Sequence, residues 1–342
     1  MSDLLRFFHP VLPSAALAKK PVAVSVGSRR FALWRDAAGR PAAVDDACPH
    51  RNAPLSLGRV RPDGRLACAY HGWCFDGAGQ GSSPSQPKLA CKTNAYRVVE
   101  RYDYLWLANS DVDEATLPAL ESPGFVLAGA FTTPFPAPIH ICLDNFTEDE
   151  HFPYVHSAFG WTEEQWGDVA FEAKTFDDHT TATYVGPQRA SPIMPLLGVS
   201  TGDLFHNSFE TRFDPLRTVY TSHWTSARGE RRRPIDARTW VFMHPEGERA
   251  TRFHTFLFVR VAPGSAFRLA LPALKIIARN FVRREWAMDA RWVEHLSDTA
   301  RELTGLRLGK YDKTVIRNRK LLKELYLGHG ESELVQLRAR AG

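Results

Sequence analysis

The stretch CPHRNAPLSLGRVRPDGRLACAYH, residues 48–71, decides the fold of the first part of the chain. Each of its ends holds one cysteine and one histidine, Cys48 with His50 and Cys68 with His71. The residues between the two pairs predict a β-hairpin, because they contain strand-like runs and a Pro-Asp-Gly turn. Thiolate and imidazole ligands suit iron or zinc far better than calcium or magnesium. The stretch therefore predicts a metal centre held at the tips of two loops.

The mixed composition of each pair distinguishes between the metals. In a [2Fe–2S] cluster of the Rieske kind, one iron keeps two cysteines and the other takes two histidines. Cys48, His50, Cys68 and His71 can supply this set, because each pair sends its thiolate to one iron and its imidazole to the other. The alternative is a structural zinc site, but the usual zinc finger groups its cysteines together and its histidines together.

Length and composition indicate a globular protein of about two domains. The chain has 342 residues, of which 44% are hydrophobic and 24% are charged, as is ordinary for soluble proteins. The net charge of +5 is mild, and the densest basic run, Arg231–Arg233, is typical of a solvated turn. We therefore expect no nucleic-acid partner, whereas a basic surface would suit an acidic electron donor.

Cysteine usage and hydropathy bear on the compartment. Cys74, Cys91 and Cys142 remain beside the two predicted cluster cysteines, and this odd set argues against a secreted disulfide framework. The opening residues, MSDLLR, do not make a signal peptide. The one candidate membrane stretch, residues 266–281, is too short and too charged to span a bilayer. We expect a cytoplasmic protein without a membrane partner.

Short alternating runs between residues 21 and 108 predict a small all-β domain, with no helix of useful length among them. Residues 109–123 are acidic and indicate a linker, so we place this domain at residues 1–115 and the linker at residues 116–125. The Gly-, Ser- and Pro-rich segment 77–87 is expected to cover the metal centre and exclude water. A plain surface loop is the alternative for that segment.

Residues 126–342 form the predicted second domain. Longer strand patterns predict a curved antiparallel sheet at residues 168–171, 180–185, 204–212, 218–226, 237–243 and 252–261. Helical patterns follow over residues 266–304 and 313–327. No glycine-rich phosphate-binding motif is present, so we expect the reducing equivalents to come from another protein.

The stretch DNFTEDEHFPYVH, residues 144–156, predicts a second metal site. Two histidines beside carboxylates suggest the facial triad that holds non-haem Fe(II) with open positions. His151 and His156 would lie about 140° apart on a regular helix of 3.6 residues per turn. Pro153 disfavours the helical conformation at Phe152, so a helix should begin or kink there. Both imidazoles can then reach one metal.

The missing carboxylate is predicted on a later helix. One face of that helix is apolar except for a single aspartate, and its members are Val282, Trp286, Asp289, Val293 and Leu296. A carboxylate on a buried stripe must be paired or must bind a metal. Asp289 is therefore the candidate third ligand, and an internal ion pair with Arg283, Arg284 or Arg291 is the alternative.

These motifs resemble those of the Rieske non-haem iron oxygenases. The segments CPHR (48–51) and CAYHGW (68–73), with Pro54 and Gly58 between them, closely resemble the family's Rieske domain. The series Asn145, Glu148, His151, His156 is similar to its N-x-x-D-x-x-H-x-x-x-x-H signature, and Asp289 with Glu294 resembles its third-ligand helix. The resemblance runs from about Arg6 to Leu327. The closing Asp312…Arg317-Asn-Arg319 resembles the branch of phthalate dioxygenase and the vanillate and dicamba demethylases.

The resemblance implies an α+β protein in which an N-terminal all-β Rieske domain is followed by a helix-grip catalytic domain and C-terminal helices. It implies two cofactors, a [2Fe–2S] Rieske cluster and a mononuclear Fe(II), and a ferredoxin or NAD(P)H-dependent reductase as partner. It further implies a homotrimer, in which a carboxylate links the Rieske histidine of one subunit to an iron-ligand histidine of the next. Electrons would pass from His71 through that carboxylate to His151.

One departure from the family pattern concerns this bridging carboxylate. The family usually has aspartate where this chain has Glu148. Glutamate keeps the charge, so Glu148 is the predicted bridge, with Asp149 as the rival and Asn145 as a further motif residue. Glu148 is favoured because it precedes His151 by three residues and so adjoins it on a helical surface.

The resemblance implies an enzyme that uses O2 to hydroxylate or demethylate a small aromatic or polycyclic substrate. Monooxygenation is the preferred prediction and cis-dihydroxylation is the alternative. A Rieske electron-transfer protein without a working second iron is the alternative from another class. The candidate pocket walls are apolar, namely Phe146, Trp161, Trp166, Met194, Leu196, Leu197, Phe205 and Trp224, and His206 and Asn207 are candidates to hold a polar substituent.

Overall fold

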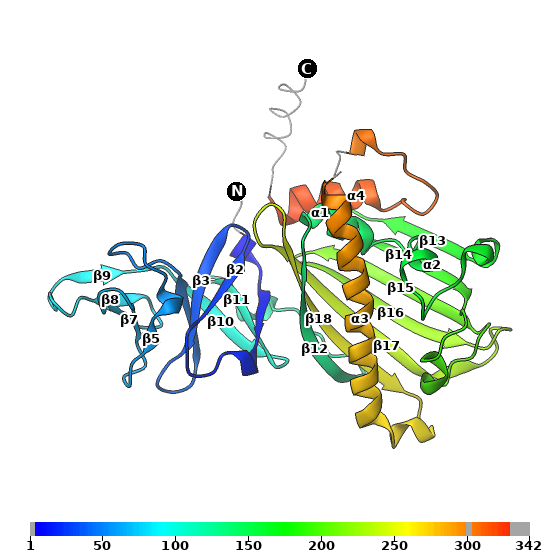
Figure 1. The fold of residues 1–342 in the computed structure, drawn as a ribbon, viewed down its shortest axis with the longest axis horizontal. Helices are drawn as coiled ribbons and strands as arrows, with labels where there is room; N and C mark the ends of the chain where they lie inside the picture. The colour runs from blue at the N-terminus through cyan, green and yellow to red at the C-terminus, as the bar shows by residue number, and fades with distance from the viewer. Residues whose placement is uncertain (1–3, 299–302, 329–342) are drawn as a thin grey trace. The chain divides into compact units, whose positions relative to one another are not determined.

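The computed structural model describes residues 4–298 and 303–328. Among them, one compact unit holds residues 4–119 with 244–248, and a second holds residues 120–243, 249–298 and 303–328 (Figure 1). The two units are built from different sheets and are described separately. Within the described ranges, no helix combines the length and the hydrophobicity that a membrane span needs.

The first unit is built from two antiparallel sheets. The six-stranded sheet has the order β1-β11-β10-β4-β3-β2, with β1 at His9–Pro13, β2 at Val22–Val26, β3 at Arg29–Arg35, β4 at Pro41–Asp45, β10 at Ala95–Arg101 and β11 at Tyr104–Asn109. The smaller sheet has the order β5-β6-β7-β8-β9, with β5 at Arg59–Val60, β6 at Leu66–Ala67, β7 at Cys74–Phe75, β8 at Gln80–Ser82 and β9 at Ala90–Lys92. Four short 3-10 turns belong to its described residues, at Leu4–Arg6, Ser14–Ala16, Leu55–Leu57 and Glu114–Thr116.

A buried cluster supports the small sheet and the two cysteine loops. Trp34, Leu55, Leu66 and Phe75 are fully buried in the cluster that also contains Cys48 and Cys68. The indole Nε1 of Trp34 donates to the carbonyl oxygen of Gly64 at 3.0 Å, which ties β3 to the turn between β5 and β6. The side chains that position the predicted cluster therefore belong to the core of this unit.

The second unit is a seven-stranded sheet with helices against it. The strand order is β12-β18-β17-β16-β15-β14-β13. Its strands are β12 at Val126–Phe135, β13 at Ala170–Thr175, β14 at His179–Pro187, β15 at Leu204–Phe213, β16 at Leu216–Thr225, β17 at Arg232–Pro245 and β18 at Thr251–Val261. The long helix α3, Leu271–Asp298, runs across the sheet, and α1 (Ile139–Asn145), α2 (Phe152–Val155) and α4 (Val315–Leu321) lie at its upper part in Figure 1.

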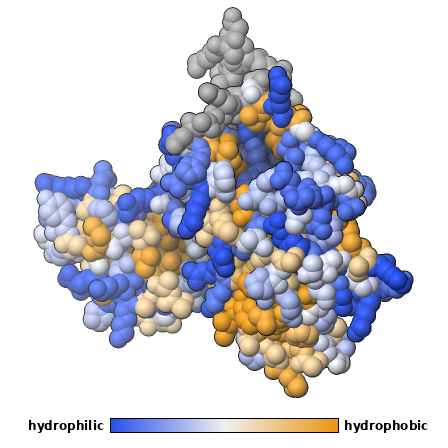
Figure 2. Space-filling model, turned by 45° about the vertical axis from the view of Figure 1, so that its right-hand side comes forward, coloured by the Kyte–Doolittle hydropathy of each residue, from blue (hydrophilic) through white to orange (hydrophobic). Residues whose placement is uncertain are grey.

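Shorter helical turns complete the second unit. The 3-10 turns are η5 at Glu163–Asp168, η6 at Met194–Leu197, η7 at Ala266–Arg268 and η8 at Leu303–Gly305, and a π-turn at Leu322–Tyr326 follows α4. Apolar surface gathers toward the end of this unit at which α3 begins (Figures 1 and 2). Exposed hydrophobic side chains of η6, of the residue after η7 and of α3 are Leu196, Leu269 and Ile276.

The predicted fold class is confirmed, an α+β chain with a β Rieske-like domain followed by a long antiparallel sheet and helices. The strand predicted at residues 168–171 was placed too early, and one strand was missed. Residues 163–168 form a 3-10 turn because Thr162 and Gln165 make a capping box, so β13 begins only at Ala170. The strand β12 was not predicted, since Gly129 and Pro134 interrupt its pattern. Pro134 is tolerated because β12 is an edge strand, with β18 as its neighbour.

The predicted helices and the 77–87 segment also differ in detail. The helix predicted over 266–304 begins only at Leu271, after a 3-10 turn, and its residues 299–302 lie outside the described residues. In the 77–87 segment, Ser83 is buried and Pro84 approaches Gly72, where an added Cβ would lie 3.5 Å from Pro84 Cγ. The remainder of the segment is mostly exposed, so it borders one cysteine loop and otherwise forms surface.

Candidate metal centres and the cavity beside them

The two cysteine loops are backbone copies of each other. In each, the cysteine N–H donates to the carbonyl five residues later, Cys48 to Ala53 at 2.9 Å and Cys68 to Trp73 at 2.8 Å. In each, the residue four positions after the cysteine returns its N–H to the cysteine carbonyl. That residue has a left-handed φ, 56° at Asn52 and 71° at Gly72, which asparagine and glycine tolerate best. Two loops of matching backbone structure can therefore bind one metal cluster from opposite sides.

The four predicted ligands divide by burial. Cys48 and Cys68 are each 2% exposed, whereas His50 and His71 are exposed and their ring centroids lie 4.6 Å apart. Trp73 stacks on His50 at 4.8 Å and fixes the orientation of its ring. This arrangement fits a binuclear cluster whose inner iron takes thiolates and whose outer iron takes imidazoles.

A bound cation would favour the thiolate forms of Cys48 and Cys68, which burial disfavours. Burial, together with the neighbouring Cys68, raises the pKa of the Cys48 thiol to about 11, against backbone N–H groups of His50 and Arg51 that lower it. Both cysteines are free thiols. A metal that replaces these protons is the usual partner of such a pair.

The second centre forms around the four-residue helix α2. His151 is the residue before its first turn and His156 follows its end, where the chain returns to an extended conformation. Pro153 lies in the first turn, where its missing N–H is not needed. The helix beginning predicted at Phe152 is confirmed. The break allows two imidazoles five residues apart to face the same point, which a continuous helix would forbid.

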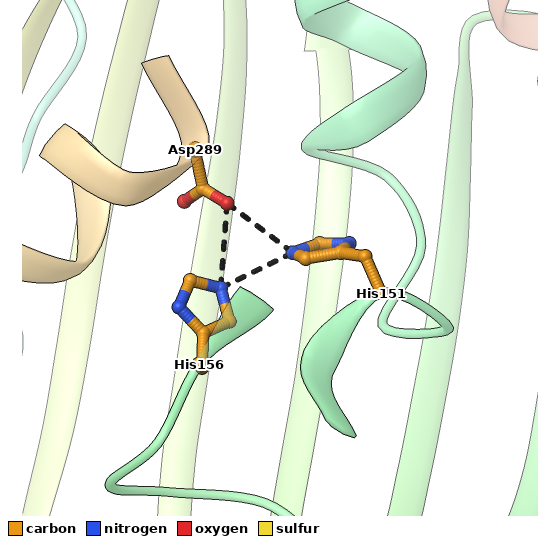
Figure 3. A group of neighbouring side chains, drawn as sticks. All are labelled: His151, His156 and Asp289. Atoms are coloured by element: carbon orange, nitrogen blue, oxygen red, sulfur yellow. Dashed lines mark hydrogen bonds and ion pairs between the residues drawn. The ribbon is translucent and has the colours of Figure 1, made fainter. Parts of the chain in front are cut away.

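Asp289 completes this centre from α3 (Figure 3). Its Oδ1 lies 3.4 Å from His151 Nε2 and 3.3 Å from His156 Nε2, and the two Nε2 atoms are 3.2 Å apart. Three donors on one face of a metal, with bonds of about 2.1 Å, would lie about 3 Å apart. Asp289 is 2% exposed, and its Oδ1 has no hydrogen-bond donor in good geometry. The three side chains therefore fit a facial metal triad.

The three residues of the triad shift one another's pKa values. Burial lowers the pKa of His151, but the Glu148 and Asp289 carboxylates raise it well above its usual value. The pKa of His156 is likewise lowered by burial and raised overall by Asp289 and Glu285. Burial raises the pKa of Asp289, but the two imidazoles lower it below its usual value. A divalent metal that binds the two imidazoles would take the place of any proton held on their inner nitrogens.

Each imidazole has a second carboxylate on its outer nitrogen. His151 Nδ1 lies 2.5 Å from Glu148 Oε1, and His156 Nδ1 lies 2.9 Å from Glu285 Oε2. Such a contact fixes the tautomer that leaves Nε2 free for the metal. The sequence did not reveal Glu285, although its position one turn before Asp289 on α3 was a possible signal. Leu296, predicted on the buried stripe, is 48% exposed.

Asp149 has different surroundings from Glu148. It is 1% exposed and accepts from Asn207 Nδ2 at 2.8 Å. Burial raises its pKa to about 7, against the lowering effect of that hydrogen bond. Glu148 in contrast contacts His151 directly, as the bridging role requires. Asn145 Nδ2 lies 3.5 Å from His151 Nδ1. The roles of Glu148, Asp149 and Asn145 stay predictions.

An ion pair fixes the segment that leads to the triad. The Arg319 guanidinium donates from Nε to both oxygens of Asp144, at 2.9 and 3.1 Å, and from Nη2 to one of them. Arg319 belongs to α4, so the closing motif of the chain is tied to the end of α1. The alternative partners proposed for Asp289, the arginines of its own helix, are not its contacts among the described residues.

A cavity of about 120 Å³ adjoins the triad. Alternate residues of β15 to β18 line one side, as the period of two in a strand requires. Residues of α3 line the other side, among them Phe281, Val282 and Glu285. The triad therefore lies at a cavity held between the sheet and the long helix.

The predicted wall residues were partly right. Phe146, Met194, Leu197, Phe205 and Trp224 line the cavity, and so does Asn207. Three predictions were wrong: Trp161 is fully buried in the core, Leu196 is 57% exposed, and Trp166 contacts Trp161 and Tyr311 instead. His206 is also absent from the wall, because its side chain alternates to the opposite face and stacks on His223.

Two family models match the chain. The Rieske [2Fe-2S] domain matches residues 7–99, and the vanillate O-demethylase oxygenase C-terminal domain matches residues 135–327. The four cysteine and histidine residues fall within the first match, and the triad falls within the second. The predicted cofactors, a Rieske [2Fe–2S] cluster and a mononuclear iron, are confirmed by these matches together with the His151, His156 and Asp289 group.

Similar proteins act on diverse substrates. Flavonoid 8-hydroxylase 2 of Ocimum basilicum is 36% identical over 132 residues, which cover 33% of this chain and 25% of the relative. The vanillate O-demethylase oxygenase subunit of Pseudomonas sp. (strain HR199 / DSM 7063) is 33% identical over 152 residues, 42% of each protein. The chain thus spans less than half the length of these relatives.

Solved structures show the same fold over nearly the whole chain. Dicamba monooxygenase bound to dicamba superposes with a TM-score of 0.77 at 21% identity, covering 96% of this chain and 98% of that one. NdmA of Pseudomonas putida CBB5 with caffeine gives 0.69 at 21% identity, covering 96% and 93%. Since the C-terminal family match alone extends over more than half of the chain and follows a Rieske match, this chain belongs to the Rieske non-haem iron oxygenases, in the vanillate demethylase and dicamba monooxygenase branch.

Proposed function

We propose that the chain is the terminal oxygenase of a multicomponent system and inserts one oxygen atom into a small aromatic or polycyclic substrate, by hydroxylation or by demethylation. The observation that carries this proposal is a three-ligand facial triad at an apolar cavity. The names of relatives support it, since they include a vanillate O-demethylase oxygenase subunit and a dicamba monooxygenase.

When bound, the Rieske cluster supplies single electrons and the mononuclear iron supplies O2 activation beside the substrate. The side chains of this chain prepare that chemistry. His151, His156 and Asp289 occupy one face and leave other positions open. The phenyl rings of Phe146 and Phe281 belong to walls that exclude water, which protects reactive species from side reactions.

We propose Glu148 as the link between the two centres of neighbouring copies. Its Oε1 lies 2.5 Å from His151 Nδ1, and its side chain is 15% exposed. It also borders a groove with exposed apolar side chains, which include Tyr154 and Trp292. Such a groove is typical of a protein interface. It supports a homo-oligomer, which we propose to be a trimer that brings His71 of a second copy to Glu148.

We propose a ferredoxin or an NAD(P)H-dependent reductase as the electron donor, docking near the exposed His50 and His71. Arg51 is exposed beside His50 and adds positive charge there, which would favour an acidic partner. The cytoplasmic location stays a prediction. Some relatives, such as chlorophyllide a oxygenase of Arabidopsis thaliana, carry a chloroplastic designation.

Turnover with a surrogate reductase tests the proposal. A panel of methoxylated, N-methylated and unsubstituted aromatics is incubated with ¹⁸O2, and oxygen uptake is compared with product. One labelled atom in the product, or formaldehyde released in proportion to uptake, is the expected result. Two labelled atoms in a cis-diol would favour dihydroxylation. Iron analysis separates the electron carrier, which holds about two irons per chain against about three for the oxygenase.

A further inference from the structure

We infer that the substrate of this cavity is an uncharged aromatic molecule, and that the cavity discriminates against aromatic carboxylates. The inference rests on the proposed oxygenase function and names the chemical class of its substrate. It separates this chain from a relative such as the vanillate demethylase, whose named substrate is a benzoate. It follows from the charges and hydrogen bonds of the wall.

Most of the wall is apolar. Beyond the triad, the sheet and helix contribute hydrophobic side chains, namely Phe146, Phe152, Phe159, Met194, Leu197, Phe205, Trp224, Ile235, Ala237, Leu257, Val259, Ala278, Phe281 and Val282. A wall of this kind binds an aromatic ring through burial and ring contacts. These side chains have no free hydrogen-bond donor or positive charge that would replace the hydration an anion loses on entering the cavity.

The charged side chains of the wall all have the wrong sign for an anion. Apart from the two iron-ligand histidines, they are the carboxyl groups of Glu148, Glu285 and Asp289, with Asp149 as a further acidic group, and no lysine or arginine is among the described residues that line the cavity. A bound Fe(II) would add two positive charges, but the carboxylate of Asp289 within the triad and those of Glu148 and Glu285 beside its imidazoles offset them. A carboxylate substrate would therefore meet a site that is already negative.

Four neutral polar groups of the wall are committed within the protein. Ser222 Oγ donates to Asn207 Oδ1 at 2.8 Å, and Asn207 Nδ2 donates to Asp149 at 2.8 Å. The Tyr220 hydroxyl donates to the carbonyl of Phe146, and the Trp224 indole donates to Gln188 Oε1 at 2.9 Å. An incoming carboxylate would have to break one of these bonds to use its hydrogen. An uncharged ring requires no such exchange.

Binding of matched ligands to the holoenzyme tests the inference without turnover. Vanillate, vanillamide and the methyl ester share one ring and differ in a single substituent. Titration calorimetry on the iron-loaded protein, without reductant, should show the amide and the ester binding at least tenfold more tightly than the carboxylate. Equal or tighter binding of vanillate would overturn the inference. So would an ammonium analogue, 4-hydroxy-3-methoxybenzylamine, that binds more tightly than the amide.

A substitution in the wall gives a second test. Met194 is buried and lines the cavity, and lysine and glutamine are close to it in length. Met194→Lys should raise vanillate affinity relative to vanillamide at least tenfold, whereas Met194→Gln should not. If Met194→Lys fails to fold, the wild-type ligand series still decides the question. An unchanged ratio in a folded Met194→Lys protein contradicts the inference.

Failure of the inference and failure of the proposed function give different results. Efficient oxygenation of vanillate, with tight binding of it, would leave the oxygenase function intact and remove the substrate class. The opposite outcome is a protein that binds the amide more tightly than vanillate but retains no mononuclear iron and oxidises no substrate. That outcome would support an uncharged aromatic ligand and contradict the oxygenase function.

Discussion

Replacing Glu285 should weaken the mononuclear iron site while leaving the Rieske cluster unchanged. Glu285 lies one turn before Asp289 on α3, is 2% exposed, and places Oε2 2.9 Å from His156 Nδ1. His156 binds iron only through a deprotonated Nε2, so its proton must stay on Nδ1. The Glu285 carboxylate lies within ion-pair distance of Nδ1 and favours a proton there, whereas leucine at the same position would not. The ring would then lose both its preferred tautomer and its orientation.

The expected loss of iron affinity follows from the contact between Glu285 and His156 Nδ1. Nδ1 of His156 is buried, and Glu285 is its ion-pair partner in the structure. Loss of such an outer carboxylate typically lowers metal affinity about 10- to 100-fold, which is about 1.4 to 2.7 kcal/mol. Glu285→Gln keeps an acceptor oxygen but removes the charge. We therefore expect Glu285→Gln to lose less affinity than Glu285→Leu.

Iron retention against a competing chelator measures this effect directly. Holoenzyme is dialysed at graded chelator concentrations, and iron per chain is compared with visible absorption of the cluster. The nitric oxide complex of the ferrous site gives a spin-resonance signal that reports ligand geometry independently of turnover. Glu294→Leu is the matched control, because Glu294 is exposed on the same helix. A Glu285→Leu protein with wild-type iron retention and an unchanged signal would refute the reasoning, as would equal loss in the control.

Three further outcomes follow from other parts of the structure. Glu148→Gln should retain both iron centres but lower coupled oxygen uptake at least tenfold, because the negative charge beside His151 Nδ1 is lost; near-normal turnover would remove Glu148 from the pathway. Arg319→Met should lower the free energy of unfolding by about 3 kcal/mol, seen as a lower Tm, because Asp144 loses its partner; a Tm within error of wild type would contradict this. Gly58→Ala should abolish the visible absorption of the cluster, since its Cβ would lie 2.1 Å from the carbonyl oxygen of Ala67; a fully coloured variant would contradict it.

The cluster was predictable from the sequence because its determinants are local. The mixed cysteine–histidine pairs lie in two short loops, and each loop forms its own hydrogen bonds. The triad was partly local as well. Pro153 revealed the break that brings His151 and His156 together, and the lone carboxylate on an apolar face revealed Asp289. In each case a residue of unusual type stood in a pattern that did not otherwise explain it.

The remaining features depend on tertiary contacts that no local pattern carries. Glu285 follows Arg283 and Arg284 in the sequence, a charged run that is typical of a solvent-exposed helix face. Only the structure places it against His156. The cavity wall depends on which face of each strand is turned toward α3. Phe205 and His206 are adjacent in sequence, yet only Phe205 lines the cavity. An apolar residue of a strand therefore gives no indication of whether it belongs to core or cavity.

The two outer carboxylates separate the sides of the iron site. Glu148 borders both the cavity and the groove with exposed apolar side chains, so its contact with His151 connects the metal to the surface of the unit. Glu285 is buried and lines the cavity but not the groove. Its contact with His156 therefore connects the metal site to the substrate space. A change in the charge on either carboxylate reaches the iron through a different imidazole. Substitution at Glu148 should therefore alter electron delivery before it alters ligand binding. Substitution at Glu285 should alter iron geometry and ligand binding before it alters electron delivery.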